Sequence, residues 1–339
     1  MTSHPYLKPA CAVDDRAERL RLTYRGRAYS FDVSAEPGVR QAVELMNGRT
    51  SVEQIARTTG LDTASVGDLV GRLAETPLLL DGAEIVRGEG ISGTEAYWRL
   101  EGQLWQWRSF DQPADRRPAS DLEIEIAKGS APVAAAKGFL LEICHQVSNA
   151  PTEIALAVAN SPTKAVRDLF MEFYEEEHAH GDMLREALAH WLPADGIDAA
   201  VPLAPTAGML SSYNWWAQSD VLRYAVALMR DEGSPLDANV TEADDVYLGM
   251  ERHYDAPAPT VERFRWHANL DVELGHGSFP LEVFAQFPVI DHRRYAQLTK
   301  VARSIVELYD AVQDAVLKYY SAHDVSSRWT AETRDALAR

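Results

Sequence analysis

Cysteine is scarce in this sequence: Cys11 and Cys144 are the only two among 339 residues. One lies in a predicted tail and the other in a helical pattern, so the sequence indicates neither a disulfide framework nor a cysteine-based metal site. Long apolar runs are missing as well, and no stretch could cross a bilayer. The N-terminal MTSHPYLKPACAVDD lacks the basic and apolar segments of a signal peptide. We therefore expect a cytoplasmic protein with no membrane partner.

Positive charge is also in short supply. Lys and Arg number 33 against 51 Asp and Glu, which gives a net charge of −18 and a pI near 5.0. Such a protein repels phosphate backbones unless it carries a concentrated basic patch. Acidic residues interrupt the basic clusters at 16–27 and 116–117. No phosphate-binding glycine loop, dinucleotide fingerprint or nucleophile elbow occurs. The sequence therefore predicts no nucleic-acid partner.

Length and composition favour a two-domain globular protein. Hydrophobic residues make up 46% of the chain and charged residues 25%, which is ordinary for a packed fold. Two regions follow different patterns. We predict a small domain over residues 17–85 and a linker with a Trp-rich helix over 86–120. A helical domain is predicted over 121–325.

The small domain has the pattern of a winged helix-turn-helix. Apolar residues alternate with polar ones at 20–24 and again at 29–33, with Arg25-Gly26 between them, which predicts a hairpin. Three short helices follow, and then a strand at 78–80. The predicted helices run near 39–46, 52–58 and 65–74, with Thr50 or Ser51 capping the second and Gly60 ending it.

Such a fold is often a DNA-binding module, but the residues here argue against that. A recognition helix needs basic or amide side chains for bases and phosphates, whereas this helix offers Asp68, Arg72 and Glu75. The segments LMNGRTSVEQIA and LVGRLAETPLLL resemble those of PqqD-like domains instead. The resemblance implies that a leader peptide is bound as an added strand on the hairpin edge. A packing or dimerisation appendage is the alternative.

From residue 121 onward the apolar positions follow a helical period, without alternating runs or internal repeats. The fold class predicted for this part is mainly α, a helical bundle large enough to hold a site in its core. The predicted helices run near 133–149, 151–160, 164–191, 215–232, 242–254, 260–276, 280–286 and 291–321.

Ionisable residues on the apolar faces of these helices are the most informative feature, because a buried charge is costly unless it is paired or bound to a metal. In RDLFMEFYEEEHAHGDMLREAL, Glu177 and His180 lie on the apolar face, one turn apart. Glu175 and His178 have the same spacing but face solvent. The sequence therefore selects Glu-x-x-His at 177–180.

Two further helices repeat this feature. Glu232 shares the apolar face of SDVLRYAVALMRDEG, and both His267 and Asp271 lie on that of VERFRWHANLDVELGHG. On an ideal helix, Glu273 and His276 face away. Carboxylates and Glu-x-x-His pairs that converge in a bundle are what a di-iron or di-manganese site requires.

These segments resemble heme-oxygenase-like diiron oxidases and oxygenases, which are related to the TenA and PqqC proteins. The resemblance covers about 130–320 and rests on EEEHAHGDMLREAL, ALMRDEG and WHANLDVELGHG. It implies that Glu177, His180 and Glu232 are ligands. The family pattern His-x-x-x-Asp-x-x-His falls on His267 and Asp271, but its third position is Leu274. His276 can replace the missing ligand if the helix unwinds between Gly275 and Gly277.

We therefore expect a non-heme iron enzyme that activates O2, with one or two irons per chain. The resemblance implies oxidation of an amino-acid-like substrate, and the PqqD-like segment suggests a leader-bearing ribosomal peptide in natural-product biosynthesis. Two alternatives stay open. The same fold could act without a metal, as PqqC does, using these residues as acids and bases, or the protein could bind peptides without catalysis. A homodimer is compatible with any of them.

Overall fold

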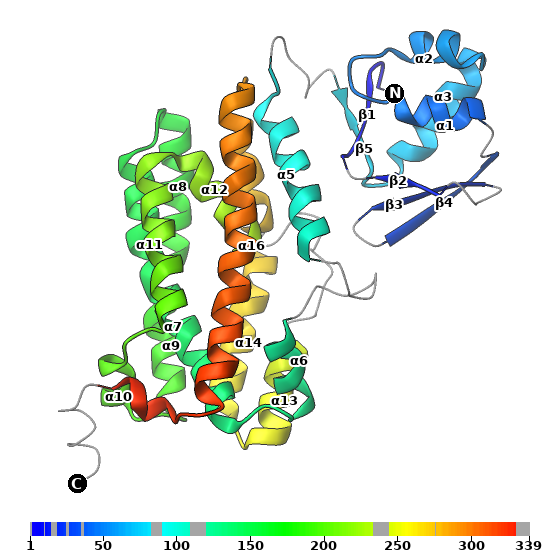
Figure 1. Cartoon of the computed structure of the whole chain (residues 1–339). Helices are drawn as coiled ribbons and strands as arrows, with labels where there is room; N and C mark the ends of the chain where they lie inside the picture. Colours follow the sequence, from blue (N-terminus) through cyan, green and yellow to red (C-terminus); the bar gives the residue numbers. More distant parts are fainter. Residues whose placement is uncertain are drawn as a thin grey trace. The chain divides into compact units, whose positions relative to one another are not determined.

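The computed structural model describes residues 2–9, 11–14, 19–24, 27–34, 37–82, 90–108, 120–232, 244–274 and 276–329. Within them, the side chains of residues 108, 244 and 271–273 are not described. The chain forms two compact units (Figure 1). The first comprises Met1–Arg116 and Pro280–Ala302, and the second comprises Arg117–Phe279 and Arg303–Arg339.

The first unit contains the predicted hairpin and three short helices. Strands β2 (Ala12–Val13), β3 (Arg19–Tyr24) and β4 (Arg27–Ser34) form an antiparallel sheet in the order β2-β3-β4. The inward positions of β3 are buried, as its alternation predicts. Strands β1 (Pro5–Leu7) and β5 (Leu79–Asp81) form a second pair, so part of the predicted N-terminal tail is ordered structure. The predicted turn at Arg25-Gly26 lies outside the described residues.

Local capping accounts for the helix boundaries in this unit. Ser51 caps helix α2 (Val52–Thr59) in a reciprocal arrangement with Gln54, and Gly60 ends the helix with φ of 74°. Asp62 caps helix α3 (Thr63–Ala74) by accepting a hydrogen bond from the Ser65 amide. Helix α1 (Pro37–Glu44) precedes them. These helices begin and end within two residues of the positions predicted from the sequence.

The first unit also takes in a distant part of the chain. Helix α5 (Gly93–Arg108) packs in this unit against helix α15 (Phe279–Ala285), where the ring of Tyr97 contacts that of Phe284. A Cβ at Gly93 would lie 1.7 Å from the Phe284 carbonyl oxygen, so only glycine permits this approach. Helix α16 (His292–Tyr320) is divided between the units after Ala302. Helical periodicity alone assigns all of 280–302 to the helical domain, because it contains no information on tertiary contacts.

The second unit is a helical bundle built on helix α7 (Val133–Ala159). Helices α8 (Lys164–Glu177), α9 (His180–Leu188) and α11 (Ala204–Ser219) contact α7 along its length (Figure 1). The remaining elements are α6 (Asp121–Lys128), α10 (Ala194–Ala199), α12 (Val221–Asp231), α13 (Asp244–Tyr254), α14 (Ala258–Glu273), η1 (His276–Ser278) and η2 (Val325–Arg328).

Three of the predicted helix boundaries are wrong. Helix α7 continues through Pro151, although proline removes one backbone hydrogen bond and normally ends a helix. The predicted helix 164–191 is broken after Glu177. The predicted helix 215–232 is two helices, α11 and α12, because Asp220 adopts an extended conformation and caps α12 through the Leu222 amide.

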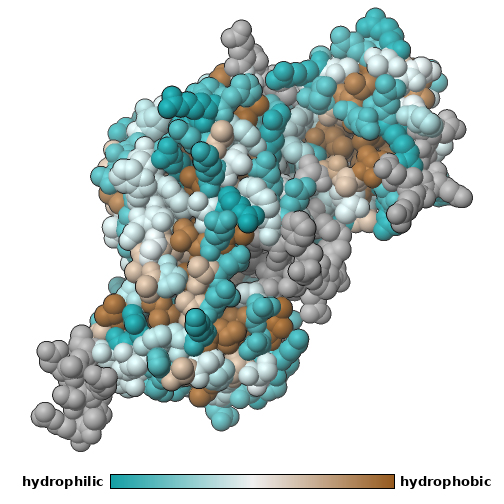
Figure 2. All heavy atoms as spheres, in the orientation of Figure 1, coloured by the Kyte–Doolittle hydropathy of each residue, from teal (hydrophilic) through white to brown (hydrophobic). Residues whose placement is uncertain are grey.

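Buried apolar side chains from α7, α8, α11 and α12 form the core of the second unit. The visible surface carries hydrophobic residues in separate clusters among hydrophilic ones (Figure 2). Among the described residues, no helix combines the length and apolar character needed to span a bilayer.

Candidate metal centre

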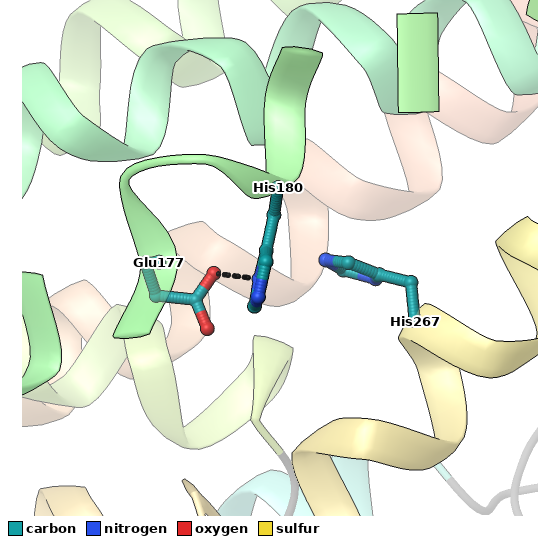
Figure 3. Close-up of side chains that lie close together, drawn as sticks. All are labelled: Glu177, His180 and His267. Carbon is teal, nitrogen blue, oxygen red and sulfur yellow. Dashed lines mark hydrogen bonds and ion pairs between the residues drawn. The ribbon is translucent and has the colours of Figure 1, made fainter. Parts of the chain in front are cut away.

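Three side chains of the second unit offer ligand atoms that lie within 4.8 Å of one another: Glu177, His180 and His267. They come from the end of α8, the start of α9 and the middle of α14, and their side chains point toward a common region (Figure 3). Glu177 and His180 are buried, and His267 is half-buried. A carboxylate and two imidazoles are a usual donor set for first-row transition metals.

The break between α8 and α9 determines how Glu177 and His180 meet. Glu177 is the last residue of α8 and His180 the first of α9, with His178 and Ala179 between the helices. The Nδ1 atom of His180 lies 2.9 Å from Oε2 of Glu177. When Nδ1 donates this hydrogen bond, Nε2 of the neutral ring keeps its lone pair, which is the form that binds a metal.

Close backbone packing holds α9 and α14 in place. A Cβ at Gly181 would lie 2.7 Å from the Ser148 Cα, so glycine lets α9 pack tightly on α7 directly after His180. The Thr260 hydroxyl donates a 2.7 Å hydrogen bond to the Ala187 carbonyl and ties α14 to α9. The rings of His180 and His267 consequently lie 5.0 Å apart, edge to face.

His276 lies at the same site, although an ideal helix would turn it away. Helix α14 ends at Glu273, and His276 begins the short helix η1, where its side chain is only 3% exposed. Its Nδ1 atom is 3.3 Å from Oε1 of Glu177 and 3.4 Å from Oε2 of Glu232. Leu274, which falls on the third position of the His-x-x-x-Asp-x-x-His pattern, is exposed. The end of the α-helix therefore allows His276 to approach the carboxylates.

Five of the six residues proposed as ligands thus lie together: Glu177, His180, Glu232, His267 and His276. The sixth, Asp271, is in α14, but its side chain lies outside the described residues. Glu175 and His178 are exposed, as the helical period predicts. The assignment of the six proposed residues as metal ligands stays a prediction, because proximity alone does not identify a bound ion.

Two neighbours of this site were not anticipated from the sequence. Glu176 hydrogen-bonds Nε2 of His276 at 3.0 Å, although its position on the helix turns it toward solvent. Phe173 contacts the His276 ring edge to face at 5.2 Å, and Phe279 stacks on Phe173 at 4.3 Å. These rings shield one side of His276 from water. An aromatic residue is expected in any helix core, so no sequence signal distinguishes Phe173.

A second polar cluster was missed entirely. Glu153 on α7 and Asp231 on α12 are surrounded by tyrosine hydroxyls. Burial, and then the charge of Asp231, raise the pKa of Glu153 to about 8. The search for ionisable residues on apolar helix faces, which selects Glu177, would also select Glu153 on an unbroken α7. Glu153 lies three turns after the buried Glu142 on that helix. Dividing α7 at Pro151 conceals that spacing.

The donor set fits a divalent transition metal. Oxygen Oε1 of Glu177 is buried and makes no hydrogen bond within the described part of the chain, while facing His276 at ion-pair distance. A buried carboxylate oxygen in this state is costly. A cation bound there would remove the cost. The imidazoles favour iron, zinc, copper or nickel over calcium and magnesium.

Comparison with known proteins gives the fold. No protein-family model and no curated protein matches the sequence. A crystal structure of a domain of unknown function with a heme oxygenase-like fold, from Shewanella denitrificans OS217, is similar with a TM-score of 0.52 and 15% identity. The match covers 67% of this chain and 93% of that one. The chain has a heme-oxygenase-like fold. At this identity the match carries the fold alone, and function rests on the site.

Proposed function

We propose that the protein is a non-heme iron enzyme that activates O2. The observation that supports the proposal is the Glu177, His180 and His267 group, whose ligand atoms lie within 4.8 Å inside a heme-oxygenase-like bundle. Two histidines and one carboxylate are the ligand set of many mononuclear Fe(II) oxygenases, which leave coordination positions open. Zinc has the same ligand preferences, so the metal must be identified by experiment.

Bound iron would supply the capacity to bind and reduce O2. The chain itself contributes the orientation and protection of that site. Glu177 orients the His180 ring by the Nδ1 hydrogen bond. Thr260 and Gly181 hold the helices that carry the two imidazoles. Phe173 and Phe279 exclude water beside His276 and lower the local dielectric, which strengthens every electrostatic interaction there.

A second metal position is part of the proposal. Nδ1 of His276 lies 3.4 Å from Glu232 and 3.3 Å from Oε1 of Glu177, which is the carboxylate oxygen that does not contact His180. Together with Glu177 as a shared carboxylate, Glu232 and His276 form a second group of ligands. Asp271 follows His267 by one helical turn and is proposed to complete one of the two positions. The proposed stoichiometry is therefore two irons per chain, with the Glu232 and His276 position weaker.

Ferrous titration with oxygen uptake tests this function. The purified protein, made metal-free, is titrated anaerobically with Fe(II), and bound iron is counted before air is admitted. We expect tight binding of at least one iron and consumption of O2 that requires it. Zinc-loaded protein is the control, because zinc occupies the same ligands without redox chemistry. If the protein fails to bind Fe(II) and still consumes O2 in the presence of a strong chelator, the proposal is contradicted and metal-free catalysis is favoured.

The substrate proposed is an amino-acid-like molecule or a leader-bearing ribosomal peptide in natural-product biosynthesis. One observation favours the peptide. Strand β4 pairs with β3 on one side only within the described sheet, so its outer edge can accept an added strand. Most of its side chains are exposed, which leaves room for the pairing.

Hydrogen exchange on the full-length protein tests peptide binding. Peptides selected from a displayed library are expected to slow exchange of the β4 amides that face away from β3, because an added strand would pair with them. Iron should not be required, since β4 is separate in sequence from every proposed ligand. A library that yields no binder, or protection confined to the helices of the second unit, would contradict peptide docking on β4.

A further inference from the structure

The second unit holds a buried polar cluster that the proposed metal chemistry does not use. Its members are Glu153 on α7, Tyr213 on α11, Tyr224 and Asp231 on α12, and Tyr309 on α16. The Tyr224 hydroxyl lies 3.3 Å from Oε2 of Glu153, and the Asn149 amide donates to Oε1 at 2.5 Å. Glu153 is 3% exposed, so water cannot solvate its charge.

The two acids of the cluster differ in burial, because Glu153 is buried and Asp231 is half-buried. Asp231 accepts hydrogen bonds at Oδ1 from the Tyr213 hydroxyl, at 3.1 Å, and from the Tyr309 hydroxyl. The Arg230 guanidinium lies 4.0 Å over the Tyr309 ring and adds positive charge nearby. Glu153, more deeply buried and close to the Asp231 charge, is the member of the pair that keeps its proton near neutral pH.

Tyr224 contacts Glu153 through its hydroxyl, and the proposed ligand Glu232 is near enough to act on that hydroxyl electrostatically. Burial raises the pKa of Tyr224, and the carboxylates of Asp231 and Glu232 raise it further. Its ring stacks on Phe170 at 6.0 Å, and Phe170 contacts Phe279 beside the centre. Packing therefore holds the tyrosine hydroxyl in one place, on Glu153 and within electrostatic range of Glu232.

We propose that Glu153 stores a proton for the candidate metal centre and releases it through the Tyr224 hydroxyl toward Glu232. This inference rests on the proposed function, because reduction of O2 consumes protons and aromatic rings shield one side of the centre from water. In the transfer, the O–H bond of Glu153 breaks and the proton binds the Tyr224 oxygen. The original Tyr224 proton leaves at the same time for the Glu232 carboxylate, directly or through a bound water. Tyr224 stays neutral, no electron moves, and solvent later reprotonates Glu153.

A purely structural acid would behave differently, and α7 offers one for comparison. Glu142 is also buried on α7, but its oxygens accept hydrogen bonds from the Leu203 backbone amide at 3.2 and 3.1 Å. Leu203 is the N-cap residue of α11, so Glu142 anchors the start of that helix. Glu142→Gln is thus a matched control: it is the same substitution in the same helix, at an acid whose tyrosine partner is Tyr320 of α16 and not Tyr224.

Infrared spectroscopy on the metal-free protein provides the first test. A protonated carboxyl absorbs separately from a carboxylate, so wild type at pH 7 is expected to show a band that E153Q lacks and E142Q keeps. The band should disappear as the pH is raised through about 8. Y224F should retain it. If E153Q and wild type give the same spectrum at pH 7, Glu153 holds no proton and the proposal is overturned, whatever the iron chemistry.

The pH dependence of iron-dependent O2 consumption provides the second test. The wild-type rate should fall above pH 8 as Glu153 loses its proton. E153Q and Y224F should be slower at pH 7, on the order of 100-fold, and flat between pH 7 and 9, while E142Q should follow wild type. Wild-type rates in E153Q would overturn the relay and leave the proposed function intact. A wild type that binds no iron would instead refute the proposed function and the relay with it.

Discussion

Replacing Glu177 with alanine is expected to abolish tight Fe(II) binding. Glu177 contacts His180 at 2.9 Å and His276 at 3.3 Å, so it joins the two groups of proposed ligands. Loss of a residue that only orients a ligand typically costs 10- to 100-fold in affinity, so loss of this one should cost more than about 100-fold. The measurement is equilibrium dialysis of metal-free protein against Fe(II) without oxygen, with iron counted per chain. His267→Ala should have the same effect.

Matched controls for these variants lie on the same short segment. Glu175 and His178 are exposed and precede Glu177 and His180 by two residues each. Glu175→Ala and His178→Ala remove the same chemical groups without touching the site, and both should bind iron as wild type does. Thermal unfolding of each variant shows whether a loss of iron reflects loss of the fold. A folded Glu177→Ala protein that binds as much iron per chain as wild type would contradict the ligand assignment.

Replacing Glu153 with glutamine is expected to stabilise the metal-free protein at neutral pH. The pKa of Glu153 is raised from 4.5 to about 8, so at pH 7 the folded protein holds a proton that the unfolded chain has released. Each pKa unit between 4.5 and 7 costs about 1.4 kcal/mol, which makes the total roughly 3 kcal/mol. Glutamine is neutral in both states and avoids this cost.

The sign of the effect fixes its pH dependence. Because the folded pKa is the higher one, the stability contributed by the protonated Glu153 is fully present below pH 4.5 and is lost as the pH rises through about 8. Urea unfolding at several pH values should therefore show Glu153→Gln gaining on wild type from pH 4.5 to 8 and levelling off above. Glu175→Gln, at an exposed position, should show no such trend. A destabilisation that is the same at all pH values would contradict the prediction, because it would mean that folding leaves the pKa of Glu153 unchanged.

Local chemistry made part of the fold predictable. The strand alternation at 20–24, the Ser51 cap and the Gly60 stop are local features, and the structure places the corresponding elements where they predict. The mainly helical character of the second unit and its heme-oxygenase-like fold were also predictable. Residues 280–302 were not assigned to the first unit, since the contacts of α5 with α15 depend on tertiary packing.

The candidate site, too, was predictable from the sequence only in part. Helical periodicity brings Glu177, His180 and His267 to inward faces, because an amphipathic helix repeats every 3.6 residues. That argument fails where a helix ends. His276 lies beyond the end of α14, and an ideal helix places it on the wrong side. Glu153 was missed because proline was taken to end the helix, so its register with Glu142 was not compared.

Crystals of the protein grown with Fe(II) under anaerobic conditions test the central claim most directly, through anomalous diffraction collected on both sides of the iron absorption edge. The account predicts a strong iron peak bounded by Glu177, His180 and His267, with a second, weaker peak beside Glu232 and His276. Equivalent crystals of Glu177→Ala should show neither. Iron-loaded wild-type crystals with no anomalous peak among these side chains, or with one only at surface carboxylates, would contradict the metal centre and the oxygen chemistry proposed for it.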